Sequence, residues 1–365
     1  MNKITRKFFA ILLSCMLVVA GVATPAKTTD NAVIAAENVA KKGTVTMTVE
    51  RITIGQGYLV SPVQVEIQNG DTVDTVFKRV MDAKGFKYDD NGYLASIENA
   101  DTGKINIPAE IYAMPDTTVW GNTNTVKAPT NTANDGNSYA NKGLGSSSYH
   151  TMAGWMFTIN NVFSNEGAAS TPVKDGDVIR WQFSVYGYGA DIGSDTESYT
   201  GIKKVTFANK DELIKEAATL VNNKTMMKDA NVKVEYNNAI KVLEKYNPSE
   251  TEVKNELIKL KNVQKDFVKK TTVTKASVKG IKNVKGLKAK VAVKKIKGVT
   301  GYQYKYSNNK KFKKAVVKST KKNTLTTKKF KKNQKCYVTV RAYKKVNGIK
   351  YYGRWSKVKA VKIKK

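Results

Sequence analysis

Apolar and polar side chains alternate along much of residues 43–208, with the period of two that is typical of a half-buried β-strand. Residues 44–50 place valine or methionine at every second position, and residues 61–67 repeat the pattern with Val, Val and Ile. Two further apolar runs, 154–159 and 178–183, also predict strands, and an Asp-Gly-Asp turn precedes the second of them. The first part of the chain is therefore predicted to be built around a β-sheet.

One segment within this region has the period of a helix instead. Thr72 or Asp71 can cap its start, Gly85 can end it, and apolar residues recur on one face between them. That stripe consists of Val73, Val76, Phe77 and Val80. Two strands, a helix and further strands predict an α+β domain with a small grasp-like sheet over residues 43–208.

Residues 209–270 change to a helical period and predict a spacer of three short amphipathic helices. Asn209 with Glu212, and Ser249 with Glu252, both have the spacing of a capping box. Apolar residues recur at helical spacing throughout the segment, so the three helices can share one small core. Their charged residues alternate in sign, which indicates a solvated surface rather than a binding site.

Residues 273–365 return to short alternating runs, and five or more strands at this spacing predict an all-β sandwich. Tyr302, Tyr304 and Tyr306 lie on one face of one run, and Cys336 begins another. The pattern resembles a fibronectin type III domain, in the Lys-rich version common in secreted Clostridia-type proteins. That family has Tyr where Cys336 stands, so the resemblance implies that the tyrosine-corner hydrogen bond is lost. Cys336 is predicted to be a buried, unreactive thiol, with a reactive surface thiol as the alternative.

Charge divides the chain near residue 270. Residues 271–365 contain 32 Lys and Arg and no Asp or Glu, whereas residues 1–270 contain 31 basic and 30 acidic residues. A field of that sign attracts polyanions. Lys offers a point charge without the bidentate geometry of Arg, which suits a diffuse and repetitive polyanion. The alternative interpretation is a compositional habit, since related domains are commonly rich in Lys.

The first residues have the layout of a secretory signal peptide. Three basic residues precede an apolar run over 8–23, and small residues follow it. Residues 1–26 are therefore predicted to be the signal, with cleavage as late as residue 36 as a second possibility. The alternative is a retained anchor, but the run is shorter than the roughly 20 residues that a spanning helix needs.

Export determines which polyanion the basic domain can meet. We expect a secreted, extracellular protein, associated with the cell wall of a Gram-positive bacterium and without a transmembrane span once the signal is removed. An anionic cell-wall polymer such as teichoic acid is then the expected partner, and nucleic acid is not a physiological one. The sequence carries no sorting signal of the LPxTG type, so attachment to the wall is expected to be non-covalent.

Three segments of the first domain carry a family resemblance. They are Gly-Trp-Met-Phe-Thr-Ile-Asn at 154–160, Lys-Asp-Gly-Asp-Val-Ile-Arg-Trp at 174–181 and Gly-Tyr-Gly-Ala-Asp-Ile-Gly at 187–193. They resemble a family of secreted bacterial domains of unassigned function, similar to the C-terminal domain of transcobalamin and intrinsic factor. The resemblance implies the same fold, with Trp155 and Trp181 as core or pocket aromatics. In the vitamin carriers this domain closes over cobalamin held against a helical barrel, which this chain lacks; an extracellular carrier of a cobalamin-like small molecule is therefore the alternative function.

Residues 114–153 are poor in aliphatic side chains and rich in Asn, Thr, Gly and Ser, which predicts a long loop. Exposed aromatic rings on such a loop can stack on a glycan or on a planar small molecule, and the alternative is that they fix the loop to its own domain. His150, in the same loop, is either a ligand-contacting base or simply solvated. The candidate ligand-binding residues are Trp120, Tyr139, Tyr149, Trp155 and Trp181.

The sequence shows no catalytic or metal-binding pattern. A single His weakens the case for a His-rich metal centre, and no C-x-x-C pair is present to hold zinc. No Ser/His/Asp order, P-loop or dinucleotide fingerprint is present. Asp175, Asp177 and Asp191 could be the paired carboxylates of a glycan hydrolase, but Asp-Gly-Asp is more typical of a turn. Residues 89–92 lack the first and closing ligands of a calcium loop. We therefore expect a non-enzymatic binding protein without cofactor or metal.

Overall fold

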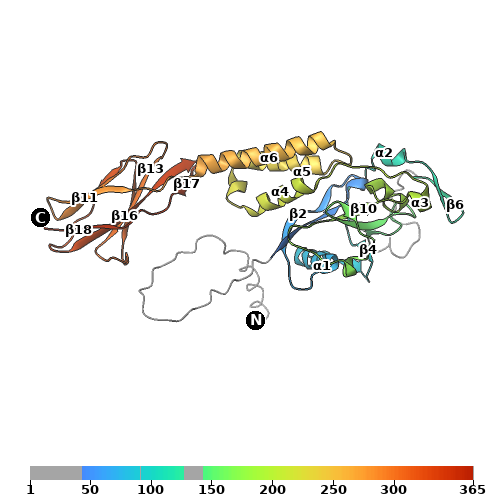
Figure 1. Cartoon of the computed structure of the whole chain (residues 1–365), viewed down its shortest axis with the longest axis horizontal. Helices are drawn as coiled ribbons and strands as arrows, with labels where there is room; N and C mark the ends of the chain where they lie inside the picture. Colours follow the sequence, from blue (N-terminus) through green and yellow to red (C-terminus); the bar gives the residue numbers. More distant parts are fainter. Residues whose placement is uncertain (1–42, 91, 127–142, 365) are drawn as a thin grey trace, which may run out of the picture. The chain divides into compact units, whose positions relative to one another are not determined.

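The computed structural model describes residues 43–90, 92–126 and 143–364. The protein is of mixed α/β class and rich in sheet (Figure 1), which confirms the predicted class in outline. The expected signal peptide and Tyr139 lie outside the described residues. Within the described ranges, no helix is long and apolar enough to cross a bilayer.

The first sheet has the strand order β2-β1-β10-β8-β9, and β1 and β10 are parallel, whereas the other neighbours are antiparallel. Its strands are β1 (Thr44–Glu50), β2 (Tyr58–Glu66), β8 (Gly154–Ile159), β9 (Val162–Phe163) and β10 (Val178–Ser184). A short 3-10 helix, η1 (Ile52–Ile54), connects β1 to β2, and η3 (Ala168–Ser170) precedes β10. Parallel pairing of the first and last strands requires a long crossover, and the segment between β2 and β8 supplies it.

Helix α1 (Val73–Lys84) covers one face of this sheet (Figure 1). The side chain of Thr72 accepts a hydrogen bond from the Thr75 backbone in a capping box, and Gly85 ends the helix in the left-handed conformation with φ 76°. The predicted stripe is buried and joins the apolar side chains of β1, β8 and β10 in one core. The predicted helix, its cap and its end are confirmed.

The opposite face of the sheet is covered as well. Every residue of β1 after Thr44 is buried, including Thr46, Thr48 and Glu50 on the face away from α1. Helix α4 (Asp211–Asn222) packs there, against β1, β2 and β10. One apolar cluster consequently runs from Tyr58 and Val178 of the sheet into the helices. The first helix of the predicted spacer is therefore a layer over the sheet.

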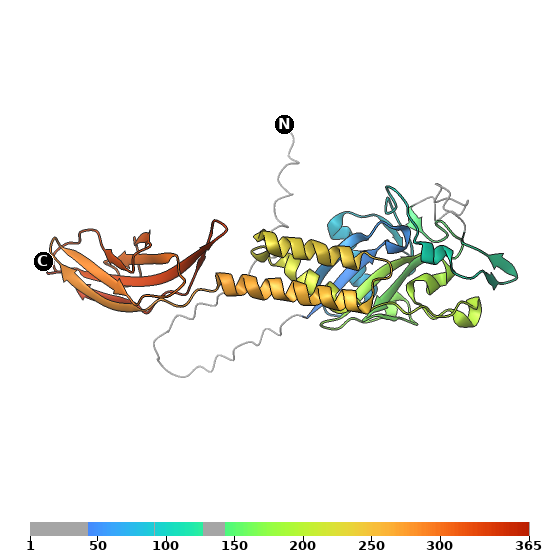
Figure 2. The same cartoon turned by 90° about the horizontal axis from the view of Figure 1, so that it is seen from above.

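The remaining helices of the predicted spacer, α5 (Ala230–Leu243) and α6 (Glu250–Thr271), run side by side (Figure 1, Figure 2). A 3-10 helix, η5 (Met226–Lys228), precedes α5. Ser249 caps α6 by accepting a hydrogen bond from the Glu252 backbone, as predicted. The predicted box at Asn209 is not formed: the cap residue of α4 is Lys210, which makes no side-chain capping bond.

The crossover between β2 and β8 holds more regular structure than predicted. A three-stranded sheet combines β3 (Tyr88–Asp90), β4 (Leu94–Ile97) and β7 (Leu144–Gly145), and a short helix, α2 (Ala109–Tyr112), follows β4. Strands β5 (Thr117–Val119) and β6 (Asn122–Asn124) form a hairpin inside the segment 114–153 that is expected to be an irregular loop. Trp120 and Gly121 make its turn with φ of 50° and 79°, because a two-residue hairpin turn favours left-handed backbone. The 3-10 helix η4 (Gly187–Ile192) and helix α3 (Glu197–Thr200) follow β10.

The C-terminal part is all-β, as predicted, and consists of two antiparallel sheets. One holds β11 (Val278–Val284), β12 (Lys288–Val293) and β15 (Thr324–Thr326); the other holds β14 (Val316–Thr320), β13 (Gly301–Ser307), β16 (Lys335–Val346) and β17 (Ile349–Tyr352), with β18 (Lys359–Lys362) also pairing β16. The three tyrosines of β13 are buried, and Cys336 is fully buried at the start of β16. Burial raises the pKa of the Cys336 thiol to about 12, in accord with the predicted buried thiol.

Candidate functional site

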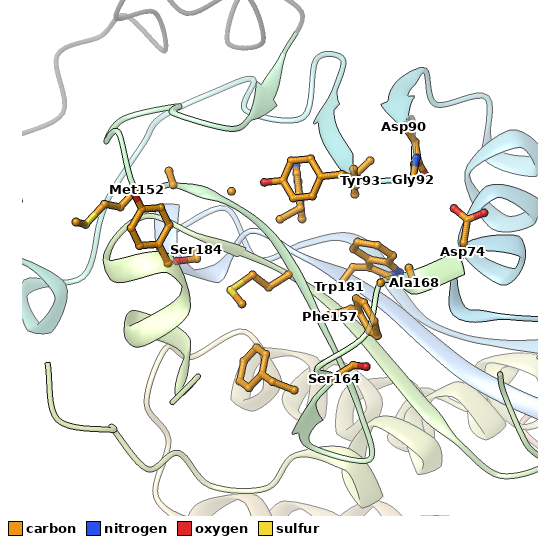
Figure 3. Close-up of a pocket in the computed structure, with 18 of the residues that line it drawn as sticks. Asp74, Asp90, Gly92, Tyr93, Met152, Phe157, Ser164, Ala168, Trp181 and Ser184 are labelled. Carbon is orange, nitrogen blue, oxygen red and sulfur yellow. The ribbon is translucent and has the colours of Figure 1, made fainter. Parts of the chain in front are cut away.

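A pocket of about 480 Å³ lies around β8 in the first domain (Figure 3). Side chains from α1, from the β3–β4 turn, from the β5–β6 hairpin and from the segments flanking β10 converge on it. Eight of them are aromatic: Tyr93, Trp120, Trp155, Phe157, Phe163, Trp181, Tyr188 and Tyr199. This size and lining are typical of a site for a small, largely apolar molecule.

Two tryptophans form the inner wall of the pocket, and each is 3% exposed. The Trp155 indole packs edge-on to Phe183, and its Nε1–H donates to the Leu144 carbonyl at 2.9 Å. Trp181 lies between Phe77 of α1 and Phe157 of β8, with ring centroids 4.8 and 5.2 Å away. Its Nε1–H has no hydrogen-bond partner in the part of the chain that the structure describes. One indole is thus satisfied and the other is not.

Three further rings form the outer rim. Trp120 is 85% exposed at the turn of the β5–β6 hairpin, and its ring lies 6.2 Å from that of Tyr188. Tyr188 in turn lies 6.3 Å from Tyr199, a residue of α3 that is half exposed. Trp120 and Tyr188 have positive φ of 50° and 53°. Left-handed backbone at bulky residues is costly and is found preferentially at binding and catalytic sites.

Two acidic side chains line another side of the pocket, near α1 and β3. Asp74 of α1 and Asp90 at the end of β3 both line it, and Lys78 lies 2.9 Å from Asp74 Oδ2 and 3.5 Å from Asp90 Oδ2. The Gly92 backbone N–H donates to Asp90 Oδ1 at 2.9 Å. Burial raises the pKa of Asp90, and a hydrogen bond shared with Asp74 raises it further. Among the described lining residues there is no Lys or Arg.

The structure brings three of the five predicted site residues together: Trp120, Trp155 and Trp181 all line the pocket. Tyr149 does not reach it. Its hydroxyl donates to Asp101 Oδ2 at 2.9 Å and its ring packs on the domain core, so this residue fixes the loop instead of presenting a ring to a ligand. Tyr139 lies outside the described residues.

His150 is held in place instead of being solvated. Its Nδ1 accepts a hydrogen bond from the Met152 backbone at 3.0 Å, and its Nε2 lies 3.1 Å from the Thr125 carbonyl. The ring also packs edge-on to Tyr186 at 4.9 Å. These contacts join the end of the long loop to the segment after β6, which is a structural role.

Sequence reasoning missed most of the pocket. Asp74 has the position of an ordinary first-turn helix charge. Tyr93 lies in a short turn and Phe163 in the two-residue strand β9, and neither segment is long enough to show a period. The clearest sequence signal was at Tyr188, which stands between Gly187 and Gly189. Two glycines so close together indicate an unusual backbone, and both have positive φ in the structure. The pattern does not identify the side chains that Tyr188 meets.

The carboxylates considered for hydrolysis have structural partners. Asp175 Oδ1 accepts a hydrogen bond from the Thr44 backbone, and Asp177 Oδ2 accepts one from the Lys174 backbone, so the predicted turn is confirmed. Asp191 is fully buried and accepts hydrogen bonds from Ser184 and from two backbone N–H groups. No group of three or more His, Cys, Asp or Glu in the described ranges could hold a metal ion.

A second group of charges is buried between the sheet and α4. Arg180 donates to both carboxylate oxygens of Glu50 at 2.9 Å. Lys210 Nζ donates to the carbonyls of Leu243 and Lys245, and burial together with the charge of Arg180 lowers the pKa of Lys210 to about 7. The adjoining cavity is about 40 Å³, which is space for little more than a water molecule. This group ties the helical layer to the sheet.

Comparisons with known proteins found a family model that matches part of this chain and a solved structure with weak similarity to it. A family described as a domain of unknown function (DUF4430) matches residues 135–185, which include β8 and all of β10; the expected resemblance to a domain family of unassigned function is confirmed for that stretch. The crystal structure of chicken CNTN1 FN1-FN3 domains is similar at 18% identity and a TM-score of 0.22, covering 26% of this chain and 33% of that chain. This chain therefore spans about a third of the length of that structure. No curated protein matches.

Proposed function

We propose that this is a non-enzymatic binding protein whose first domain holds a small, ring-containing ligand in the aromatic pocket. The observation that carries the proposal is the convergence of eight aromatic side chains on a pocket of about 480 Å³. Rings on three sides bury apolar surface, and each stacked pair adds to the free energy of binding beyond the area that it buries. Tyr188 at the rim has a positive φ outside any hairpin turn, and this backbone strain supports a binding site there.

The basic C-terminal domain indicates where the protein acts. We propose that the protein is secreted through the segment 1–26 and that its basic sandwich docks on an anionic cell-wall polymer. Its support is the excess of 32 positive charges in residues 271–365 and the outward position of lysines such as Lys282, Lys288 and Lys290, which are exposed on β11 and β12. Lys282 and Lys290 lie directly opposite each other in the sheet, an arrangement that costs stability unless a polyanion neutralises it.

A carrier of a cobalamin-like molecule is the second candidate, favoured by the aromatic pocket and by the family resemblance. The order β2-β1-β10-β8, with β1 parallel to β10, supports a grasp-like sheet of the kind that the resemblance implies. Likewise, a three-stranded sheet facing a larger one supports a fibronectin type III-like sandwich. Whether the ligand is a corrinoid or a smaller ring compound is decided by binding.

The pocket is tested with N-phenyl-1-naphthylamine, a neutral dye that fluoresces in apolar surroundings and is not attracted by the basic domain. We expect saturable binding to the purified protein, displaced by any true ligand; cobalamin and cobinamide are the corrinoid arm. Trp120→Ala and Tyr199→Ala should each weaken dye binding roughly three- to tenfold. The matched control is Tyr112→Ala, because Tyr112 is 37% exposed and does not line the pocket.

Unchanged affinity in both rim variants, or an equal loss in Tyr112→Ala, would refute the pocket as the binding site.

Docking on the cell wall has its own assay: binding of the whole protein to purified Gram-positive walls, before and after removal of teichoic acid, over a salt series. We expect binding that needs the polymer and falls steeply with salt. Replacing Lys282, Lys288 and Lys290 with Glu should weaken it more than replacing them with Gln.

A further inference from the structure

Every cation–π contact in the described ranges has its cation on one sheet of the C-terminal domain, the sheet that contains β13, β16 and β17. Lys305 Nζ of β13 lies 5.4 Å from the centre of the Phe312 ring, and Lys350 Nζ of β17 lies 5.3 Å from that of Tyr343. On β16, between these two strands, Arg341 lies against two rings. This sheet therefore carries three cations that aromatic side chains hold in place.

Arg341 is the most firmly held of the three. Its guanidinium carbon lies 3.9 Å from the centre of the Tyr352 ring and 4.5 Å from that of Trp355. Its Nε–H donates to Gln303 Oε1 at 2.8 Å, and Gln303 is the residue directly opposite Arg341 on β13. Rings against the planar group and an acceptor at Nε fix the direction in which the guanidinium fork points.

The remaining donors of Arg341 are free and open to solvent. An Arg side chain has five N–H donors, and Nη1 and Nη2 donate to none of the described residues. Neither nitrogen is among the buried side-chain atoms that lack a partner, so both are in contact with solvent. Residues 271–365 contain no Asp or Glu, so the domain itself offers this guanidinium no carboxylate. The fork is thus ordered, accessible and without a counter-charge of its own domain.

A guanidinium fork binds two oxygens of one anion side by side, which is the geometry of a phosphate or a carboxylate group. The register places Lys305 opposite Thr339 and Lys350 opposite Lys345 of β16; at about 3.3 Å per residue and 4.8 Å per strand, their Cα atoms are roughly 8 and 14 Å from that of Arg341. An anionic chain that crosses the strands consequently meets these cations in turn. A phosphodiester fits that course, because its two free oxygens belong to the polymer backbone, whereas a carboxylate ends a side branch.

We propose that the outer face of β13, β16 and β17 is the docking surface for the anionic polymer, and that the Arg341 fork binds both non-bridging oxygens of one of its phosphodiester groups. This inference rests on the proposed docking on the cell wall, because it specifies the site and the chemical group for the same partner. Gln303, Tyr352 and Trp355 are positioning residues that hold the fork. The lysines of β11 and β12, on the other sheet, contribute attraction without a defined contact.

Binding of the whole protein to poly(glycerol phosphate), measured over a salt series, tests the assignment. Arg341→Lys keeps the charge and removes the fork, so affinity should fall about tenfold at every salt concentration. The dependence of affinity on salt reports the number of charges neutralised, so Arg341→Lys should leave its slope unchanged, whereas Lys305→Gln and Lys350→Gln should each reduce it. Arg354→Lys is the matched control, because Arg354 is the other arginine of the domain and is exposed; its affinity should equal that of the unmodified protein.

Trp355 provides a second measurement, which needs no weakened variant. Because its ring packs on Arg341, a phosphodiester bound at the fork should change Trp355 fluorescence. Trp355→Phe should abolish the fluorescence change caused by poly(glycerol phosphate), since the other three tryptophans belong to the first domain.

The outcomes separate this inference from the proposed function. Equal affinity of Arg341→Lys and the unmodified protein, or a fluorescence change that persists in Trp355→Phe, would overturn the Arg341 site and leave docking by diffuse charge intact. Poly-L-glutamate that binds as tightly as poly(glycerol phosphate), with the same loss in Arg341→Lys, would overturn the phosphodiester in favour of a carboxylate polymer. If neither polymer binds the unmodified protein at low salt, docking on the cell wall falls and the Arg341 site falls with it.

Discussion

The buried ion pair between β1 and β10 should be the most sensitive point of the first domain. Glu50 is 2% exposed and Arg180 is 6% exposed, and two hydrogen bonds of 2.9 Å join them. Burial by itself would raise the pKa of Glu50, but the charge and the hydrogen bond of Arg180 outweigh it and lower that pKa. The carboxylate is therefore ionised in the folded protein and compensates the charge of a buried guanidinium.

Replacing Glu50 with Gln keeps the shape of the side chain and removes its charge. Arg180 then remains buried without its bonded counter-charge, although the carboxylate of Asp211 still lies close enough to attract it. Lys210 is nearby as well, and its pKa is already lowered by burial and by Arg180. Removing one partner of a buried pair costs about 3–5 kcal/mol in the free energy of unfolding. With an m-value of about 2 kcal/mol/M, the urea midpoint should fall by roughly 1.5–2.5 M.

Urea unfolding followed by Trp fluorescence measures this loss, in a Trp355→Phe background so that the signal comes from the first domain. Glu212→Gln is the control, since Glu212 forms an exposed pair with Lys215 at 3.3 Å and should cost less than about 0.5 kcal/mol. The double variant with Glu50→Leu and Arg180→Met should be more stable than Glu50→Gln, because it leaves no unpaired charge. A loss below about 1 kcal/mol in Glu50→Gln, or a double variant as unstable as the sum of its single variants, would show that an unpaired Arg180 does not destabilise the first domain.

Three other predictions concern single side chains. The pKa of Lys210 is lowered to about 7 in the folded protein, so between pH 7 and about 10 the unfolded chain binds one more proton than the folded one. The free energy of unfolding should therefore rise with pH across that window. Lys210→Met should flatten this rise, which urea titrations at several pH values measure. In the protein without residues 1–26, which removes Cys15, Cys336 should react with Ellman's reagent only in denaturant, because burial raises its thiol pKa to about 12; rapid reaction of the native protein would contradict its burial. Trp155→Phe should lower the free energy of unfolding by at least about 1 kcal/mol through loss of the bond to Leu144, whereas Trp120→Ala at the exposed turn should change the thermal midpoint little.

Local pattern predicted much of the secondary structure. The start, buried stripe and end of α1 follow from Thr72, the apolar spacing and Gly85, all of which act within a few residues. Alternation predicted the buried face of β13 and β16, since neighbouring side chains of a strand point to opposite faces. Thr339 and Tyr343 belong to the other face of β16 and are nevertheless buried. Alternation failed on β1, where Thr46, Thr48 and Glu50 are buried although they are polar, because α4 covers the face that would otherwise be solvated.

The candidate site was predicted only in part. Trp120, Trp155 and Trp181 were chosen as aromatic residues in a suspect region, and the structure places all three on one pocket. Tyr149 satisfied the same criterion and serves to fix the loop through Asp101. The tryptophans and Tyr149 differ in the residues that their rings contact, and those residues are distant in the sequence. A sequence pattern holds no information on such contacts.

The sequence by itself determined α1, the long strands of the first sheet and the division of charge at residue 270, because these depend on the side chains present and on their spacing. The tertiary structure alone decided the pocket. Pairing of β1 with β10 joins residues 130 apart, as in the Glu50–Arg180 bond, and the same closure brings α1, β8 and the β5–β6 hairpin around one volume. Whether a tryptophan N–H finds an acceptor there depends on the position of distant backbone: Trp155 donates to the Leu144 carbonyl, and Trp181 has no acceptor among the described residues.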